Sequence, residues 1–469
     1  MSAETRIERD TMGEMTVPAD ALYGASTQRA VENFPISGRA VPAEVIHAFG
    51  YLKAACAKVN LDLGKLDKER ADLIIKASEE ISRGELDKHF PVDVFQTGSG
   101  TSTNMNANEV IANRCAQMAG NPIGAKDPVH PNDHVNMGQS SNDTFPTAMQ
   151  IAGARAISEN LIPSLERLAA ALHKKAKEFD HITKIGRTHL MDATPIRLGQ
   201  EFSGYAAQAD YAVTRAKRAM QRMAENLPIG GTAVGTGLNT HIEFGKRVAA
   251  ELTEATGISF QEAQNHYEAQ ATRDCIIDAS GSLKTIAVSF SKIANDIRWL
   301  GSGPRCGLFE LSLPATQPGS SIMPGKVNPV ICESMVQVAC QVVGNDAAIT
   351  YGGFGGVGSL MELNVAMPMM ADNLFDSIRI LSSVAGTFVE KLLDGLVANE
   401  DICTGMVEKS LMMCTSLAPV IGYEKAAQVA KTAFKENKTI REYCTEMKLL
   451  DDKQLNELLD PTNMTHPSS

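Results

Sequence analysis

Five long stretches with helical hydrophobic spacing dominate the middle of the chain. They cover residues 144–178, 197–225, 267–300, 329–350 and 361–397. At about 1.5 Å per residue, the first would extend for roughly 50 Å. A helix of that length needs apolar partners along its whole length, so we predict that the five stretches pack as one bundle. Few segments alternate with the period of two that a half-buried strand requires, and we therefore expect an all-α protein.

The segments on either side of this bundle have a different pattern. Residues 1–139 mix turn-rich loops with helices of medium length, and residues 399–469 carry shorter helices. A chain of 469 residues is also too long for one ordinary core. We therefore predict three domains: an N-terminal domain over 1–139, a central long-helix domain over 140–398 and a small C-terminal helical domain over 399–469.

The charge and the cysteines argue against several classes of function. The formal net charge is −11, from 44 Lys and Arg against 55 Asp and Glu, and so acidic a chain is poorly suited to bind nucleic acid. The nine cysteines are scattered and form no Cys-x-x-Cys pair, which argues against a disulfide framework, a zinc site or an iron–sulfur cluster. We expect reduced thiols, no metal and no cofactor.

The N-terminal segment and the hydropathy predict a cytoplasmic location without a membrane partner. Residues 1–10 carry acids and lack an apolar run, unlike a secretory or transit peptide. No stretch of the chain approaches the roughly 20 apolar residues of a membrane span.

The segment from Gly319 to Pro329, GSSIMPGKVNP, is the strongest candidate for a ligand site. Gly319 and Gly325 let the backbone approach a ligand and expose its N–H groups. Lys326 is a compact cation and Asn328 a neutral donor, which together suit a carboxylate or a developing oxyanion. An ordinary turn-rich loop would explain any five-residue piece of this segment, but the coincidence of chemically matched residues over its whole length favours function.

This segment resembles the signature loop of the fumarase/aspartase superfamily, and the likeness to its class II fumarases extends along nearly the whole chain. The other segments that resemble characteristic regions of these fumarases are 6–13, 97–106, 130–136, 139–143, 186–190 and 460–465.

The resemblance implies the reversible, metal-independent hydration of fumarate to L-malate, a step of the tricarboxylic acid cycle. Ser320 matches the base that removes the proton from carbon, and a serine needs N–H groups and a cation such as Lys326 to stabilise its alkoxide. His189 matches the histidine that handles the water. Glu333 matches the carboxylate that fixes the tautomer of this histidine.

The resemblance also implies two sets of binding residues. Those expected to contact the substrate are Ser99, Gly100, Thr101, Ser140, Ser141, Asn142, Thr188, Ser321, Lys326, Val327 and Asn328. A second dicarboxylate site corresponds to His130, Pro131, Asn132 and Asp133. A His-Pro-Asn-Asp sequence is also a good structural turn by itself, and the two interpretations of this segment stay equally open.

In assembly, the resemblance implies a homotetramer with a 20-helix core. Each active site would then combine three subunits, with the segments 99–106 plus 140–142, 188–189 and 320–328 coming from different chains. Small dicarboxylates are the expected partners.

Two other functions remain as alternatives. Aspartate ammonia-lyase shares the loop and the fold, but Ser99 stands where aspartases tend to carry alanine, and Ser141 where they tend to carry threonine. A non-catalytic structural member of the superfamily could lose Ser320, His189 or Lys326 without penalty, yet all three are present.

Overall fold

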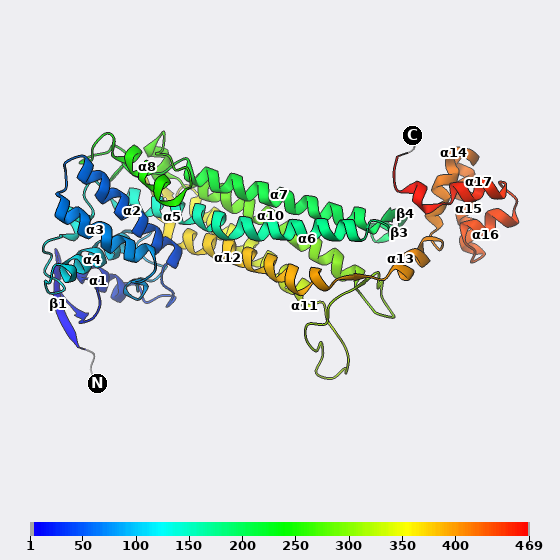
Figure 1. Ribbon diagram of the computed structural model, residues 1–469, viewed down its shortest axis with the longest axis horizontal. Coiled ribbons are helices and arrows are strands. Elements are labelled where there is room, and N and C mark those ends of the chain that lie inside the picture. Colours follow the sequence, from blue (N-terminus) through cyan, green and yellow to red (C-terminus); the bar gives the residue numbers. More distant parts are fainter. Residues whose placement is uncertain (1–3, 468–469) are drawn as a thin grey trace. The chain divides into compact units, whose positions relative to one another are not determined.

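The computed structural model describes residues 4–467, and its secondary structure is mainly helical (Figure 1). The prediction of an all-α protein is thereby confirmed. Contacts divide the chain into two compact units. Within the described residues, unit 1 comprises the chain up to Pro163, Thr214–Ala287 and Ala339–Ser382, and unit 2 comprises Ser164–Val213, Val288–Val338 and the chain from Ser383 onward. The division into three domains at 139 and 398 stays a prediction.

Each of the five predicted long stretches is largely helical. The helices are α5 (Ser141–Ala156), the π-helical turn η3 (Ile157–Leu161), α6 (Ile162–Glu178), α7 (Leu198–Ala224), α10 (Asp274–Leu300), α11 (Val330–Gly353) and α12 (Met367–Lys391) (Figure 1). Two of them begin later than predicted. A separate short helix, α9 (His266–Ala271), precedes α10 because Thr272 is extended. A small hairpin of β6 (Ser359–Leu360) and β7 (Leu363–Asn364) precedes α12.

Polar contacts fix the neighbouring long helices inside unit 1. Asp346 on α11 accepts hydrogen bonds from Ser280 and Lys284 on α10, and all three positions lie in the middle of their helices. Asn345, the residue before Asp346, donates to Asp376 on α12. Ser280, Asn345 and Asp346 are buried among mostly apolar residues, so their hydrogen bonds help to specify how the helices are aligned.

The N-terminal part of unit 1 is organised around α2 (Ala43–Asp62). Its neighbours are α3 (Lys68–Ser82), α4 (Thr101–Met118), α5 and α8 (Phe244–Thr256), and α1 (Ala25–Asn33) packs against α4. Val45, Phe49, Leu52 and Cys56 of α2 are fully buried, as their helical spacing predicts. The sequence predicted turn-rich loops and helices in this part of the chain but no strand, whereas β1 (Thr5–Asp10) and β2 (Gly13–Pro18) pair as an antiparallel hairpin.

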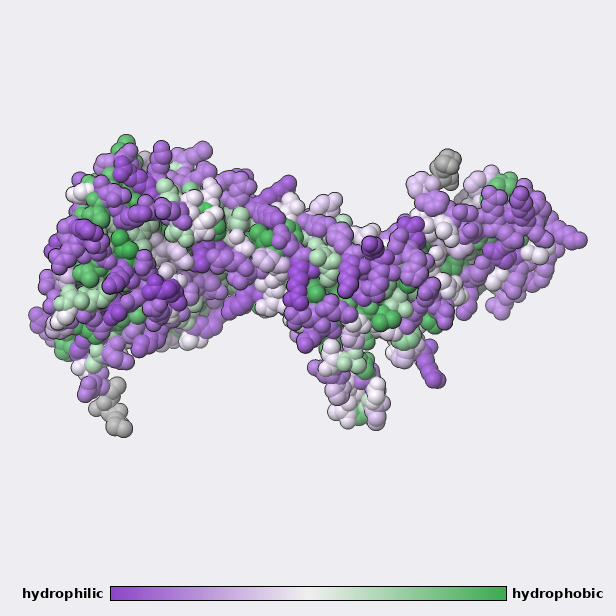
Figure 2. All heavy atoms as spheres, viewed as in Figure 1, coloured by the Kyte–Doolittle hydropathy of each residue, from purple (hydrophilic) through white to green (hydrophobic). Residues whose placement is uncertain are grey.

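Unit 2 contains a third hairpin and a long loop. Strand β3 (Thr183–Thr188) pairs with β4 (Met191–Arg197), and β5 (Leu311–Ser312) pairs with β8 (Val397–Ala398). The loop before α11 carries exposed apolar side chains, and Figure 2 shows this protruding segment as pale purple to green.

The C-terminal part of unit 2 is a small helical cluster with a core of its own. Its helices are α13 (Glu400–Val407), α14 (Ala418–Ile421), α15 (Tyr423–Lys435), α16 (Ile440–Glu446) and α17 (Asp452–Leu458), together with the short turns η5 (Leu411–Leu417) and η6 (Pro461–Met464). Leu417, Val429, Ile440 and Leu455 are buried together in it. Among the described residues, no helix is long and apolar enough to cross a membrane.

Candidate active site

Two helix N-termini meet in unit 1 at the residues predicted to contact the substrate. Thr101 is the first residue of α4 and Ser141 the first residue of α5, and their hydroxyl oxygens lie 2.7 Å apart. The hydroxyl of Ser99 lies 2.8 Å from that of Thr101. Helix N-termini favour anions because their first N–H groups are unpaired and the helix dipole is positive there. The pair of N-termini with three hydroxyl groups is therefore a suitable binding site for a carboxylate.

Gly100 is required where α4 begins. It is the N-cap residue of this helix and has a φ of +73°, a conformation that side chains rarely adopt. A Cβ atom at this position would also overlap the ring of the buried Phe145. The glycine therefore allows the α4 N-terminus to lie directly against α5.

Asp143 anchors the neighbouring segment 140–142. Its carboxylate accepts the backbone N–H of Ser140 at 2.9 Å and those of Gly230 and Thr232 at 3.2 and 2.9 Å. Burial raises the pKa of Asp143 to about 7, while these N–H donors and the nearby Lys53 act in the opposite direction. Asn142, in turn, donates to the carbonyl of Ala233 at 2.8 Å. A buried carboxyl group thus connects the start of α5 to the glycine-rich loop at 228–237.

In unit 2, the segment 319–328 closes on itself. The Gly319 N–H donates to the Lys326 carbonyl at 2.7 Å, and the Asn328 amide donates to the Gly319 carbonyl at 2.6 Å. The Ser320 hydroxyl oxygen accepts the backbone N–H groups of Ile322 and Met323 at 3.2 and 3.0 Å. Two N–H groups aimed at one hydroxyl oxygen favour negative charge on it.

His189 lies at the tip of the β3–β4 hairpin with an unusual backbone. His189 and Leu190 have φ values of +55° and +60°, which a two-residue turn of type I′ requires but which normally select Asn or Gly. Each such residue costs roughly 1–2 kcal/mol. Thr188, His189 and Leu190 are all exposed. Strain of this kind is typical of functional sites. The turn places His189 at the tip of the hairpin, between the two strands.

A buried ion cluster connects this hairpin to the base of the long loop. Glu310, which is fully buried, lies 2.8 Å from Arg187 and 3.3 Å from Lys184 on β3. Lys184 also lies 3.2 Å from Glu201 at the start of α7. Glu310 directly precedes β5, so the cluster fixes the strand that ends at Thr188 against the segment that leads to Ser320.

The predicted site residues of unit 2 do not form one bonded group. The loop 319–328 carries Ser320, Ser321, Lys326, Val327 and Asn328, whereas the β3–β4 hairpin carries Thr188 and His189. Glu333 lies in the first turn of α11. In the described part of unit 2, no hydrogen bond or ion pair connects His189 to Glu333 or to Ser320.

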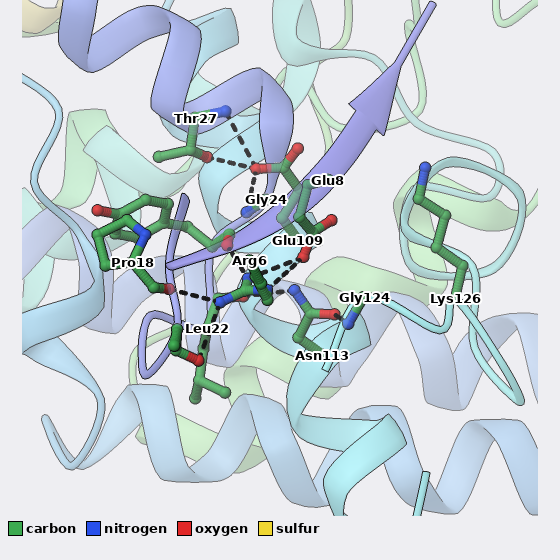
Figure 3. Close-up of polar contacts among 12 residues, drawn as sticks. Arg6, Glu8, Pro18, Leu22, Gly24, Thr27, Glu109, Asn113, Gly124 and Lys126 are labelled. Carbon is green, nitrogen blue, oxygen red and sulfur yellow. Dashed lines mark hydrogen bonds and ion pairs between the residues drawn. The ribbon is translucent and has the colours of Figure 1, made fainter. Parts of the chain in front are cut away.

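The second predicted site borders a cavity of about 320 Å³ in unit 1. Its lining includes Lys126, His130, Pro131 and Asn132 together with the acidic residues Glu8, Asp10 and Glu109. Figure 3 shows that Glu109 binds the backbone at Gly24 and Thr27, the N-terminal end of α1. Burial raises the pKa of Glu109.

Local bonds also explain the turn at this second site. The His130 side chain accepts the backbone N–H of Asp133 at 3.2 Å, and the backbone N–H of His130 donates to His134 at 2.8 Å. Asp133 does not line the cavity. Both interpretations of this segment, a binding site and a structural turn, therefore retain support.

Comparisons with known proteins identify the family to which this chain belongs. The family model described as lyase matches residues 13–344, and the model of the fumarase C C-terminus matches residues 413–466. A class II fumarate hydratase of Corynebacterium efficiens is 55% identical, over 97% of this chain and 94% of its own length. A mitochondrial fumarate hydratase of Danio rerio is 52% identical, over 98% and 90%. The crystal structure of a class II fumarase from Schistosoma mansoni matches with a TM-score of 0.96 at 38% identity, covering 99% of this chain and 100% of that one. This chain belongs to the class II fumarases.

Sequence reasoning missed two buried residues beneath the site of this class II fumarase. Asp143 lies inside a segment that carries the resemblance, but its role as anchor depends on Gly230 and Thr232, which are distant in sequence. Lys53 lies in the middle of α2 and is fully buried. A lysine among the apolar positions of a predicted helix was the available signal, because Lys is almost never buried without partners.

Proposed function

We propose that this class II fumarase hydrates fumarate reversibly to L-malate, a step of the tricarboxylic acid cycle, without a metal ion. The observation that carries the chemistry is the pair of N–H groups directed at the Ser320 hydroxyl oxygen. In the direction of malate dehydration, the Ser320 alkoxide removes the proton from the carbon next to a carboxylate. The two N–H groups and the Lys326 ammonium stabilise the alkoxide before this step.

His189 acts on the other side of the reacting bond. It donates a proton to the departing hydroxyl group during dehydration and accepts a proton from water during hydration. Glu333 fixes the tautomer of this imidazole by accepting its second N–H. The exposed, strained tip of the β3–β4 hairpin allows His189 to reach a substrate held elsewhere.

The substrate carboxylates are held by neutral donors and by one cation, Lys326. The proposed contacts at the two helix N-termini are Ser99, Gly100, Thr101, Ser140, Ser141 and Asn142. The proposed contacts from the hairpin and the loop are Thr188, Ser321, Lys326, Val327 and Asn328. The intermediate carries additional negative charge on one carboxylate, so donors that are already oriented lower its free energy more than that of the substrate.

We further propose a homotetramer in which three chains contribute to each active site. Two observations support it. His189 has no partner in its own unit 2 among the described residues, although the mechanism requires Glu333 and Ser320 near it. Large apolar side chains are also exposed on the long helices, namely Val288 and Trp299 on α10 and Val343 and Tyr351 on α11. Their burial against further copies would complete a 20-helix core.

The cavity bounded by Lys126, His130 and Asn132 is proposed as the second dicarboxylate site, with Pro131 and Asp133 shaping its turn. The cationic Lys126 and the donors of His130 and Asn132 suit a carboxylate. A cytoplasmic location stays a prediction.

The function is tested by offering L-malate and L-aspartate separately, with chelator present, and following the absorbance of fumarate. We expect fumarate from malate alone and its loss in the Ser320→Ala variant. Fumarate and ammonia from aspartate would instead identify an ammonia-lyase. Turnover that chelator abolishes would contradict the metal-independent mechanism.

A further inference from the structure

A lysine is completely buried beneath the substrate-binding segments of unit 1. Lys53 lies in the middle of α2 and has no exposed surface. Burying an ammonium group costs several kcal/mol unless hydrogen bonds replace its water. No carboxylate lies within ion-pair distance of Lys53 among the described residues, so its charge is compensated in another way.

Three amide oxygens take the place of water around this ammonium. Lys53 Nζ donates to Asn104 Oδ1 at 2.9 Å, to Gln139 Oε1 at 2.9 Å and to Asn136 Oδ1 at 3.2 Å. An ammonium has three N–H groups and no acceptor, so the three bonds satisfy it completely. A neutral amine could not do the same, because it has two N–H groups and a lone pair.

Each of the three acceptors belongs to a segment that carries predicted site residues. Asn104 lies one turn after Thr101 on α4. Gln139 directly precedes Ser140, the N-cap residue of α5. Asn136 is the C-cap residue of the π-helical turn η2 (Pro131–Val135), next to the second site. Lys53 is thus the common partner of three segments that are far apart in sequence.

Further polar contacts link these segments directly to one another. The Thr144 hydroxyl on α5 lies 3.0 Å from Asn104 Oδ1 and 2.8 Å from the Ser140 carbonyl. Asn104 also donates to Asn136 at 3.2 Å. The ammonium therefore lies at the centre of a buried network that sets the separation of the α4 and α5 N-termini, and with it the 2.7 Å contact of Thr101 and Ser141.

Burial, more than neighbouring charge, determines the pH at which Lys53 loses its proton. Burial lowers the pKa of Lys53 to about 8, and Cys56 on α2 and Asp143 on α5 act in the opposite direction. Burial raises the pKa of the Cys56 thiol, which therefore stays neutral. The network with its full charge consequently exists only below a mildly alkaline pH.

We propose that Lys53 is a positioning residue for dicarboxylate binding, whose buried ammonium holds the α4 and α5 N-termini at the spacing that receives a substrate carboxylate. The inference rests on the proposed function for the identity of the ligand. Lys53 does not touch the substrate and acts through Asn104 and Gln139. Its positive charge also lies beneath a site for an anion.

The test compares Lys53→Met, which keeps the length of the side chain without the charge, with Lys53→Arg, which keeps the charge. Lys58→Met is the matched control, because Lys58 lies on the same helix but is itself exposed and forms a partly exposed ion pair with Glu251. Binding of the unreactive dicarboxylate succinate is measured by calorimetry, together with kcat and KM for L-malate. Circular dichroism and thermal unfolding establish that each variant is folded.

We expect Lys53→Met to weaken succinate binding and raise KM about 10- to 100-fold, with a smaller change in kcat, since misplacement by ~1 Å has effects of that size. Lys53→Arg should recover part of the affinity, and Lys58→Met should match the wild type. A folded Lys53→Met variant with wild-type affinity for succinate would overturn the inference.

The wild-type protein supplies a second measurement that needs no variant of Lys53. Its affinity for succinate should fall as pH rises through about 8, while that of folded Lys53→Met should stay constant there. If the affinity of the wild type for succinate does not change between neutral pH and about 9.5, the inference is overturned. This result would hold even if Lys53→Met fails to fold. Succinate binding without malate turnover would contradict the proposed function and leave this test of Lys53 intact.

Discussion

Gly100 is subject to two constraints, a positive φ and a close contact with a neighbouring side chain, and Gly257 shares only the first of them. Gly100 and Gly257 both have a φ of +73°, but a Cβ atom would overlap Phe145 at Gly100 and would meet nothing within 4 Å at Gly257. Substitution by alanine at Gly257 therefore imposes backbone strain alone. At Gly100 it also requires displacement of the ring of Phe145, a buried residue of α5.

We predict that Gly257→Ala lowers the free energy of unfolding by about 1 kcal/mol and leaves activity unchanged. Gly100→Ala should cost about 2 kcal/mol more and abolish most malate turnover, because the α4 N-terminus must move away from Ser141. Unfolding midpoints in guanidinium and initial rates check both. Equal losses of stability in the two variants would show that Phe145 yields to the new methyl group.

Leu190 offers a test of the strain in the hairpin. Its φ of +60° suits asparagine better than leucine, and its side chain is exposed. We predict that Leu190→Asn stabilises the protein by about 0.5–1 kcal/mol, measured as a rise in Tm at fixed protein concentration. Met191→Asn, on strand β4 and equally exposed, is the control and should not raise Tm.

Among the elements, β3 depends on the buried ion cluster around Glu310. We predict that Glu310→Gln destabilises the protein by about 3 kcal/mol, because Lys184 and Arg187 lose a buried counter-charge. The matched control is Glu390→Gln, which removes an exposed ion pair with Arg167 in the same unit and should cost less than about 1 kcal/mol. Chemical denaturation gives both values, and equal costs would argue against the cluster as the anchor of the hairpin.

The start of α5 should respond to pH through Asp143. Its pKa is raised from 3.8 to about 7, so between these values the folded state holds a proton that the unfolded state has released. Asp143 therefore contributes a few kcal/mol to the free energy of unfolding. This contribution is fully present below pH 3.8 and is lost as pH rises to about 7. Asp143→Asn should flatten this part of the stability curve. An unchanged slope would mean that the N–H donors keep the carboxylate ionised.

Periodicity predicted the long helices well because burial along a whole face requires apolar residues at 3.6-residue spacing. It missed the β1–β2 hairpin and the break at Thr272, since strand pairing and short breaks depend on partners that the local pattern does not contain. The segment 319–328 was predicted as a site because its residue types are unusual together, whereas the segments 99–101 and 140–142 were predicted from the family resemblance. Glu310 was missed because only the fold reveals that its side chain is buried. Lys53 was missed although its place among the apolar positions of a predicted helix was a signal of burial.

At the scale of the whole molecule, the residues proposed for binding and catalysis are divided between the two units of one chain. Unit 1 holds the helix N-termini proposed to bind a carboxylate, and unit 2 holds the Ser320 loop and the His189 hairpin. His189 lacks a bond to Glu333 or Ser320 among the described residues of its own unit. An assembly in which separate copies supply these groups would account for a catalytic histidine on an exposed hairpin.

This assembly predicts complementation between two inactive variants. Ser320→Ala and His189→Asn chains should each be inactive alone, because every site then lacks either the base or the imidazole. If one site takes Ser320 and His189 from different chains, co-expression in equal amounts should restore about a quarter of wild-type activity, since random assembly gives some sites both intact groups. Recovery should disappear when the two changes are combined in one chain and co-expressed with the Ser320→Ala variant. No recovery in verified mixed oligomers would place both residues in the same chain and contradict the shared site.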